Sequence, residues 1–163
     1  MEIASMMNWD LHKIDVKIDF LNGVIKEEVY IEQPQGFEDR QTHVCKLKKA
    51  LYGLKQAPRA WYGRIDSFLT SLDFTKSKAD PNLYFKVIED ETIILILYVD
   101  DLFLTWNEKQ IVECKKKLAE EFETKGLGSM HYFLGLEVWQ SSEGIFLNQG
   151  KYLVEILKIF DML

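Results

Sequence analysis

The sequence has few of the residues that build disulfide frameworks or histidine-rich metal sites. Its 163 residues include only two cysteines, Cys45 and Cys114, and three scattered histidines. Two distant cysteines fit neither a disulfide framework nor a zinc-ligand pattern. The N-terminus lacks the basic and apolar regions of a signal peptide, and no apolar run is long enough to span a bilayer. We therefore expect a soluble intracellular protein that is not secreted and makes no contact with a membrane.

The composition is that of one globular domain with an uneven distribution of charge. Hydrophobic residues make up 47% of the chain and aromatic residues 13%, which excludes a disordered protein. The net charge is −6, which argues against a surface that is basic throughout. Between Arg40 and Arg64, however, there are seven basic residues and no Asp or Glu. The overall charge thus conceals one basic segment.

The most informative stretch is TIILILYVDDLFLTW, at residues 92–106. An apolar run ends at Asp100 and Asp101 and resumes at Leu102, which predicts a buried strand, a tight turn and a second strand leaving from Leu102. Asp is common in turns, so the plain interpretation is a hairpin turn. The alternative is that two adjacent carboxylates bind a cation such as Mg²⁺, which prefers oxygen ligands. That alternative requires a third carboxylate from elsewhere in the chain.

The rest of the chain predicts an α+β fold with an antiparallel sheet. Alternating apolar residues indicate a strand at 10–18, with Asp15 on the face opposite Ile14 and Val16. Helices are expected from Pro58 onward, after an N-cap at Asn107 with Gln110 at the third position, and at 151–160. Further strands and hairpins are expected at 27–34, 44–47, 83–97 and 131–148. Helices packed on one face of the sheet would allow Asp15 to lie beside the hairpin tip.

The basic segment also contains aromatic residues, in KKALYGLKQAPRAWYGR at residues 48–64. Trp61 falls on the apolar stripe of the expected helix, so it fits a core anchor, with Arg59 and Arg64 on a solvated face. Basic residues interleaved with aromatics also suit contacts with phosphates and bases. The residues alone leave both interpretations open.

Seven stretches, in order, resemble the reverse transcriptase palm of copia-type LTR retrotransposons, a part of their pol polyprotein. They are DVKIDFLNG (15–23), EEVYIEQPQGF (27–37), KLKKALYGLKQAPRAWY (46–62), DPNLYF (80–85), YVDDLFLT (98–105), HYFLGLEV (131–138) and EGIFLNQGKYLVEIL (143–157). Together they cover nearly the whole chain. A YxDD motif alone is modestly specific, but its combination with ALYGLKQAPRAWY and YFLGLEV is highly specific. The resemblance implies a polymerase palm-like antiparallel sheet with a C-terminal hairpin and helix.

The resemblance implies RNA-directed DNA polymerisation at a site with two Mg²⁺ or Mn²⁺ ions. These ions would be held by Asp15, Asp100 and Asp101, where a primer 3′-hydroxyl attacks a deoxynucleoside triphosphate. The expected partners are an RNA or DNA template-primer and deoxynucleoside triphosphates, in the cytoplasm or in a particle. By position in the motifs, Phe20 would exclude a ribose 2′-hydroxyl, Gln56 would contact the nucleotide, and Lys125 would be a possible general acid. Nucleic-acid contacts are expected from Lys48, Lys49, Lys55, Arg59 and Tyr132.

Two departures from the family pattern affect what this chain is expected to do. Ile18 and Asp19 stand where the family has a small or polar residue and then Ala, and Asp19 adds negative charge where a triphosphate would approach. Residues 1–163 are expected to form a reverse transcriptase fragment without the fingers, most of the thumb or RNase H, and so to be inactive as an isolated chain. A non-catalytic relic that at most binds metal or nucleic acid is the alternative function. Another two-metal palm enzyme, such as a nucleotide cyclase, fits the carboxylates but leaves LKQAPRAW unexplained.

Overall fold

The centre of the molecule is a six-stranded antiparallel sheet. The computed structural model describes residues 1–39, 43–89, 91–106, 108–125 and 128–163. The strand order is β4-β5-β6-β7-β1-β8, and every neighbouring pair is antiparallel. The strands are β1 (Asp10–Val16), β4 (Thr75–Lys76), β5 (Leu83–Ile88), β6 (Glu91–Tyr98), β7 (Asp101–Trp106) and β8 (Thr124–Lys125). The apolar run in β6 and β7 thus lies near the middle of the sheet.

Two helices cover one face of this sheet. They are α2 (Ala57–Ser71) and α3 (Glu108–Glu121). Trp61, Ile65 and Leu69 of α2 and Ile111, Cys114 and Leu118 of α3 join one buried cluster with the strand residues that point to this face. Burying so much apolar surface is the main force that holds the helices on the sheet. Helix α2 begins at Ala57, with Pro58 in its first turn, where proline is well tolerated.

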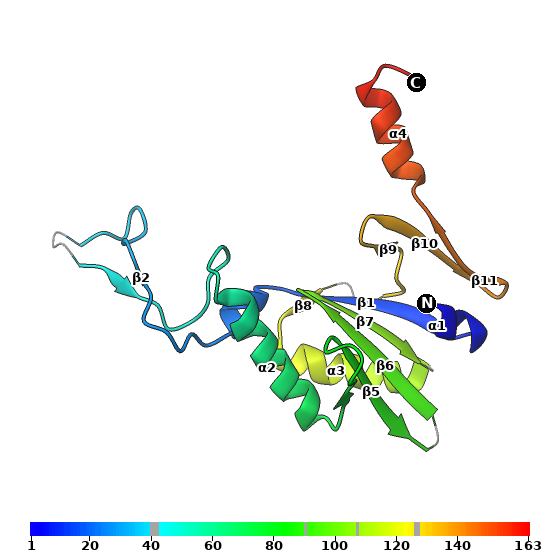
Figure 1. The fold of residues 1–163 in the computed structure, drawn as a ribbon, viewed down its shortest axis with the longest axis horizontal. Coiled ribbons are helices and arrows are strands. Elements are labelled where there is room, and N and C mark those ends of the chain that lie inside the picture. The colour runs from blue at the N-terminus through cyan, green and yellow to red at the C-terminus, as the bar shows by residue number, and fades with distance from the viewer. Residues whose placement is uncertain (40–42, 90, 107, 126–127) are drawn as a thin grey trace.

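The opposite face of the sheet is only partly covered. A second cluster contains Leu11 and Phe103 from the sheet and Met130 and Val138 from the C-terminal part of the chain. That part forms a three-stranded sheet of β9 (Tyr132–Phe133), β10 (Leu136–Ser141) and β11 (Gly144–Asn148), in the order β11-β10-β9. The short helix α1 (Glu2–Met6) supplies Ala4 to the same cluster. The last helix, α4 (Gly150–Ile159), stands beyond this small sheet and away from the central one (Figure 1).

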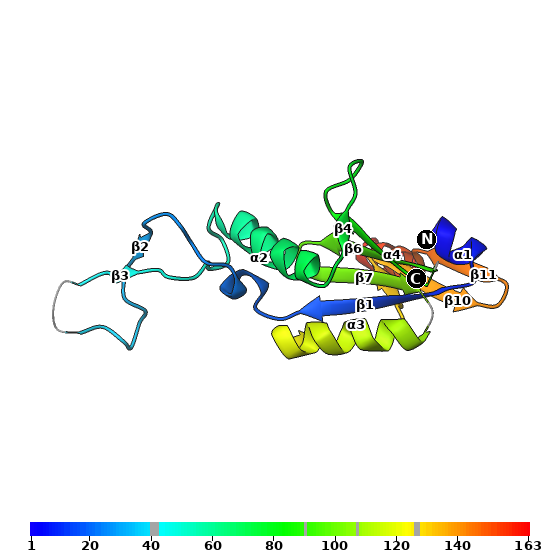
Figure 2. The ribbon, with the colours of Figure 1, turned by 90° about the horizontal axis from the view of Figure 1, so that it is seen from below.

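A long arm projects from the other end of the central sheet, as Figure 2 shows. The arm is the stretch between the short 3-10 helix η1 (Asp19–Asn22) and the start of α2. It contains the paired strands β2 (Tyr30–Ile31) and β3 (Cys45–Lys46). A small cluster of Ile25, Ala50 and Ala57 anchors the base of the arm against the start of α2. Farther out, Phe37 is 83% exposed. The arm is therefore held mainly at its base.

The expected α+β class, with helices packed on one face of an antiparallel sheet and a C-terminal hairpin and helix, is confirmed. The strands expected at 27–34 and 44–47 are present but shorter than predicted, as the two-residue strands β2 and β3. The sequence did not predict α1, β8 or the separate pairing of β9 with β10. The proposed N-cap at Asn107 lies outside the described residues. Within the described residues, none of the helices is long and apolar enough to traverse a bilayer.

Candidate active site

The YVDD stretch forms a two-residue hairpin turn whose shape is held from two sides. Tyr98 pairs with Asp101, so Val99 and Asp100 occupy the turn, and β7 begins one residue earlier than the predicted Leu102. Val99 has φ +55°, a conformation that costs energy for a β-branched residue. The indole Nε1 of Trp61 donates a 2.6 Å hydrogen bond to the carbonyl oxygen of Val99. The amide of Val16 donates a 3.0 Å bond to the carbonyl oxygen of Asp100.

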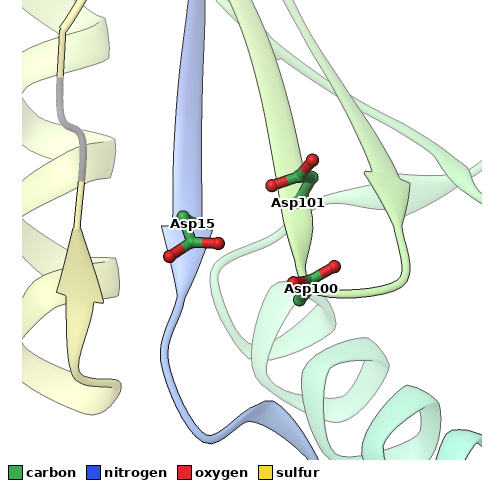
Figure 3. Close-up of side chains that lie close together, drawn as sticks. All are labelled: Asp15, Asp100 and Asp101. Atoms are coloured by element: carbon green, nitrogen blue, oxygen red, sulfur yellow. The ribbon is translucent and has the colours of Figure 1, made fainter. Parts of the chain in front are cut away.

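Strand β1 brings a third carboxylate to this turn. Asp15 lies directly opposite Asp101 in the antiparallel pairing of β1 with β7, so their side chains share one face of the sheet. Ile14 and Val16 point to the other face, where they are at most 2% exposed. One oxygen from each of Asp15, Asp100 and Asp101 lies within 4.8 Å of the others, and Figure 3 shows the three side chains grouped at the ends of the two strands. The predicted convergence of three carboxylates is therefore present.

The electrostatic environment of the triad includes a lysine and a fourth carboxylate. Burial raises the pKa of Asp101, and the charges of Asp100 and Asp15 act in the same direction, while the Lys13 ammonium opposes them. Lys13 Nζ lies 2.6 Å from Asp101 Oδ2. Burial also raises the pKa of Asp19, with smaller contributions from Asp100 and Asp15. One oxygen of Asp19 is buried without a hydrogen-bond partner.

The donor set of the triad suits Mg²⁺ or Mn²⁺. Three carboxylates offer only oxygen ligands, which these hard cations prefer over nitrogen and sulfur. The Asp101 side chain is 15% exposed, so its charge is poorly screened by water. The fourth carboxylate, Asp19, increases the local excess of negative charge. Asp15, Asp100 and Asp101 are thus the residues that would hold a divalent ion.

The two residues that were expected to contact the nucleotide, Phe20 and Gln56, line different cavities. Phe20, in η1, lines a cavity of about 280 Å³ that also touches Trp61, Tyr98 and Val99. It therefore lies beside the carboxylate turn. Gln56 directly precedes α2 and lines a different cavity, of about 580 Å³, together with Arg59. The two predicted nucleotide contacts thus face different hollows in this structure.

The possible general acid, Lys125, lies next to the triad in the sheet. Lys125 in β8 is directly opposite Asp15 in β1, and Asp15 is opposite Asp101, which is opposite Tyr98. Directly opposed residues of antiparallel strands point to the same face. Lys125 thus belongs to a row of side chains that crosses four strands through the triad. The pairing of β8 with β1 places this lysine beside the site.

The predicted nucleic-acid contacts are exposed but are not gathered at the triad. Lys48, Lys49, Lys55 and Arg59 are all solvent-exposed, in the arm and at the start of α2. No ion pair engages these four residues within the described ranges, whereas Lys46 is paired with Glu28, and Arg64 with Glu121. Tyr132 lies in the three-stranded sheet, where its hydroxyl accepts a hydrogen bond from Lys151 of α4.

Sequence reasoning gave Lys13 no role and left that of Trp61 open. Trp61 was weighed as a core anchor, and it is 2% exposed, but its hydrogen bond to the YVDD turn could not be anticipated. The position of Lys13 could have been predicted, because a residue two places before Asp15 in a strand points to the same face of the sheet as Asp15. The alternation of apolar residues in this strand drew attention to Ile14 and Val16 and not to Lys13.

Comparisons with known proteins place the chain in one family. The model of the family "Reverse transcriptase (RNA-dependent DNA polymerase)" matches residues 1–163. The retrovirus-related Pol polyprotein from transposon TNT 1-94 of Nicotiana tabacum is 40% identical, over 99% of this chain and 13% of that protein. The retrovirus-related Pol polyprotein from transposon RE1 of Arabidopsis thaliana is 36% identical, over 99% of this chain and 11% of that protein.

The similarity extends to yeast. The transposon Ty1-DR1 Gag-Pol polyprotein of Saccharomyces cerevisiae is 31% identical, over 96% of this chain and 9% of that protein. The chain thus spans about a tenth of the length of these curated relatives. With a family model matched from the first residue to the last, this chain belongs to the reverse transcriptase family of retrotransposon Pol polyproteins.

Proposed function

We propose that this chain is the palm of an RNA-directed DNA polymerase and that its carboxylate triad is the centre of nucleotidyl transfer. The observation that carries the proposal is the approach of Asp15, Asp100 and Asp101 to within 4.8 Å. When bound, two divalent ions would activate the primer 3′-hydroxyl and stabilise the charge on the reacting phosphate and the leaving pyrophosphate. The substrates proposed are a template-primer and deoxynucleoside triphosphates.

The chain's own residues would hold and orient the reactants. Asp15 and Asp100 would anchor the ions, while the hydrogen bonds from Trp61 and Val16 keep the turn that carries Asp100 in place. Phe20 lies beside that turn, where its ring would discriminate against a ribose 2′-hydroxyl. Lys125, in the same row as the triad, would supply a proton to the leaving pyrophosphate. Gln56 and Arg59 would meet the nucleotide and the template from the side of α2.

We further propose that the isolated chain does not polymerise DNA. Phosphoryl transfer depends on holding the triphosphate in line with the attacking oxygen, and positioning supplies much of the rate enhancement. The arm that would contribute to this positioning is anchored mainly at its base. The buried, unpartnered oxygen of Asp19 adds repulsion close to Asp100 and Asp15. Each loss of 1.36 kcal/mol in positioning or charge stabilisation is a tenfold loss in rate.

The test is primer extension on poly(rA)/oligo(dT) with Mg²⁺ or Mn²⁺. Three proteins are compared: the chain as given, the chain fused behind the upstream polymerase segment of a relative, and that fusion with Asp19→Ala. Each is measured beside its Asp100→Asn variant as the blank. We expect extension above the blank only in the fusions, with more in the Asp19→Ala form. Extension by the isolated chain would contradict its proposed inactivity, and silence in both fusions would contradict the polymerase assignment.

The second candidate is a non-catalytic relic that binds metal or nucleic acid. The observation that favours it is Asp19, whose charge lies near the triad at a position where the family pattern has Ala. Silent fusions that still bind Mn²⁺ and template-primer would support this candidate. Extension by the Asp19→Ala fusion but not by the unmodified fusion would assign the loss of activity to Asp19.

A further inference from the structure

Lys13 occupies a distinctive place beside the triad. It lies two residues before Asp15 in β1, so both side chains point to the same face of the sheet. Its Nζ is 2.6 Å from Asp101 Oδ2, and the two side chains are 35% and 15% exposed. The backbone amide of Lys13 donates to the carbonyl oxygen of Gly128, which helps to fix this part of the strand. The ion pair is thus supported by the strand and partly shielded from water.

This ion pair makes the three carboxylates unequal in their availability to a divalent ion. Asp101 already has a cation at hydrogen-bond distance. Among the residues that the structure describes, neither Asp15 nor Asp100 forms an ion pair with a lysine, arginine or histidine. A divalent ion that approached Asp101 would have to displace the ammonium or bind close to it, against repulsion of like charges. An ion held by Asp15 and Asp100 would meet less resistance.

We propose that Lys13 is a positioning residue: it holds the Asp101 carboxylate in an ion pair, so that Asp15 and Asp100 are the two carboxylates that bind the first divalent ion. The inference rests on the metal use in the proposed function. It assigns different roles to two adjacent aspartates of one motif, Asp100 as a ligand and Asp101 as a carboxylate held by the ion pair. Two protein carboxylates are a usual number for Mg²⁺.

Removal of Lys13 should convert a site with two available carboxylates into one with three. The added ligand and the lost positive charge both favour the divalent ion, so Lys13→Gln should bind Mn²⁺ more tightly. We expect a gain of about tenfold, which corresponds to about 1.4 kcal/mol. Without metal, the same variant leaves three carboxylates close together without their cation, so it should be less stable than the wild type.

The experiment is Mn²⁺ titration by calorimetry and electron paramagnetic resonance, without nucleotide. It compares wild type, Lys13→Gln, Asp101→Asn and the double variant, with Asp15→Asn as the reference for loss of a ligand. If Lys13 reserves Asp101, Asp101→Asn should cost little affinity in the wild type and about tenfold more in the Lys13→Gln background. Lys13→Arg should keep the wild-type affinity, because it preserves the charge and the ion pair. Melting in EDTA should show a loss of stability in Lys13→Gln that Lys13→Arg restores.

Charge alone would give a different result. Suppose that Lys13 acted only through the general electrostatic field of its charge and not through the ion pair. Asp101→Asn would then cost the same Mn²⁺ affinity in the wild-type and Lys13→Gln backgrounds, and the effects of the two substitutions would add. Additive costs, or an unchanged affinity of Lys13→Gln, would overturn the inference while leaving the metal site intact. A lack of Mn²⁺ binding in all six proteins would overturn the proposed metal use, and the inference would fall with it.

Discussion

The central sheet and the C-terminal helix α4 differ in how their apolar side chains are covered. Strand β7 is buried from Leu102 to Trp106, and α3 inserts Ile111 and Leu118 into the same cluster. Helix α4 also has an apolar stripe, yet none of its residues is buried, and Leu153 is 57% exposed. The apolar stripe of α3 is thus buried and that of α4 is exposed, because of these two helices only α3 packs on a complementary face of the sheet. The carboxylates belong to the packed region, where their geometry is fixed by the core.

The arm extends this contrast to the predicted nucleic-acid contacts. The triad is held by backbone pairing and by the hydrogen bond from Trp61. Lys48, Lys49 and Lys55 are exposed and lie between β3 and α2, outside that core. Packed segments resist local opening more than exposed ones do. The protein thus combines a carboxylate triad held by the packed sheet with exposed basic residues, whose contacts with nucleic acid stay a prediction.

The largest expected difference compares one leucine in each region. Leu118→Ala in α3 removes a side chain with 0% exposure, and such cavities cost about 3 kcal/mol of unfolding free energy. Leu153→Ala in α4 makes the same helical substitution at an exposed site and should cost about 0.5 kcal/mol or less. Urea unfolding of both variants measures the difference. Equal losses would show that α4 is packed in solution and would remove the contrast.

The second comparison concerns salt-dependent binding by the basic segment. Replacing Lys48, Lys49 and Lys55 with Ala should flatten the plot of log affinity against log salt by about two to three units. The expected contribution is about 0.9 per duplex phosphate contact and about 0.7 for a single strand. Lys109, Lys116 and Lys117, on the exposed side of α3, provide a control triple variant of equal charge change. Equal slopes for the two variants would mean that binding follows net charge and not the basic segment.

The smallest effect concerns the polar link between α2 and the sheet. Burial raises the pKa of Asp66, but hydrogen bonds from Lys76 and Tyr84 outweigh it and bring the pKa below its usual value. A lowered carboxyl pKa stabilises the fold above the unfolded value of 3.8, and this contribution is lost as pH falls through the folded value. Asp66→Asn should therefore cost about 1 kcal/mol at pH 7.

The pH profile separates this link from a general loss of packing. As the pH falls from 3.8 through the lower folded pKa, the wild-type carboxyl also becomes protonated, so the stabilities of Asp66→Asn and wild type should converge over this range. Chemical unfolding of both proteins from pH 7 to pH 3 measures this. A difference that stays constant across the range would assign the effect to shape and not to the charge of Asp66.

The sequence by itself determined the features that depend on local periodicity and on motifs. Alternation in β1 placed Asp15 opposite Ile14 and Val16, and helical spacing marked the buried stripes of α2 and α3. The order of the motifs indicated the family, and the YVDD stretch predicted the hairpin. These features were accessible because side-chain direction repeats every two residues in a strand and about every 3.6 in a helix.

The tertiary structure decided everything that depends on strand pairing and on distant partners. Only the register of β1 with β7 places Asp15 opposite Asp101, and only β8 brings Lys125 beside them. The ion pair of Lys13 with Asp101 and the indole bond to Val99 join residues that are far apart in the chain. The sequence also did not reveal that the apolar stripe of α4 is exposed, because an amphipathic pattern shows that a face can be buried but not what covers it. Register and partnership are properties of the folded chain, and they set the chemistry of this site.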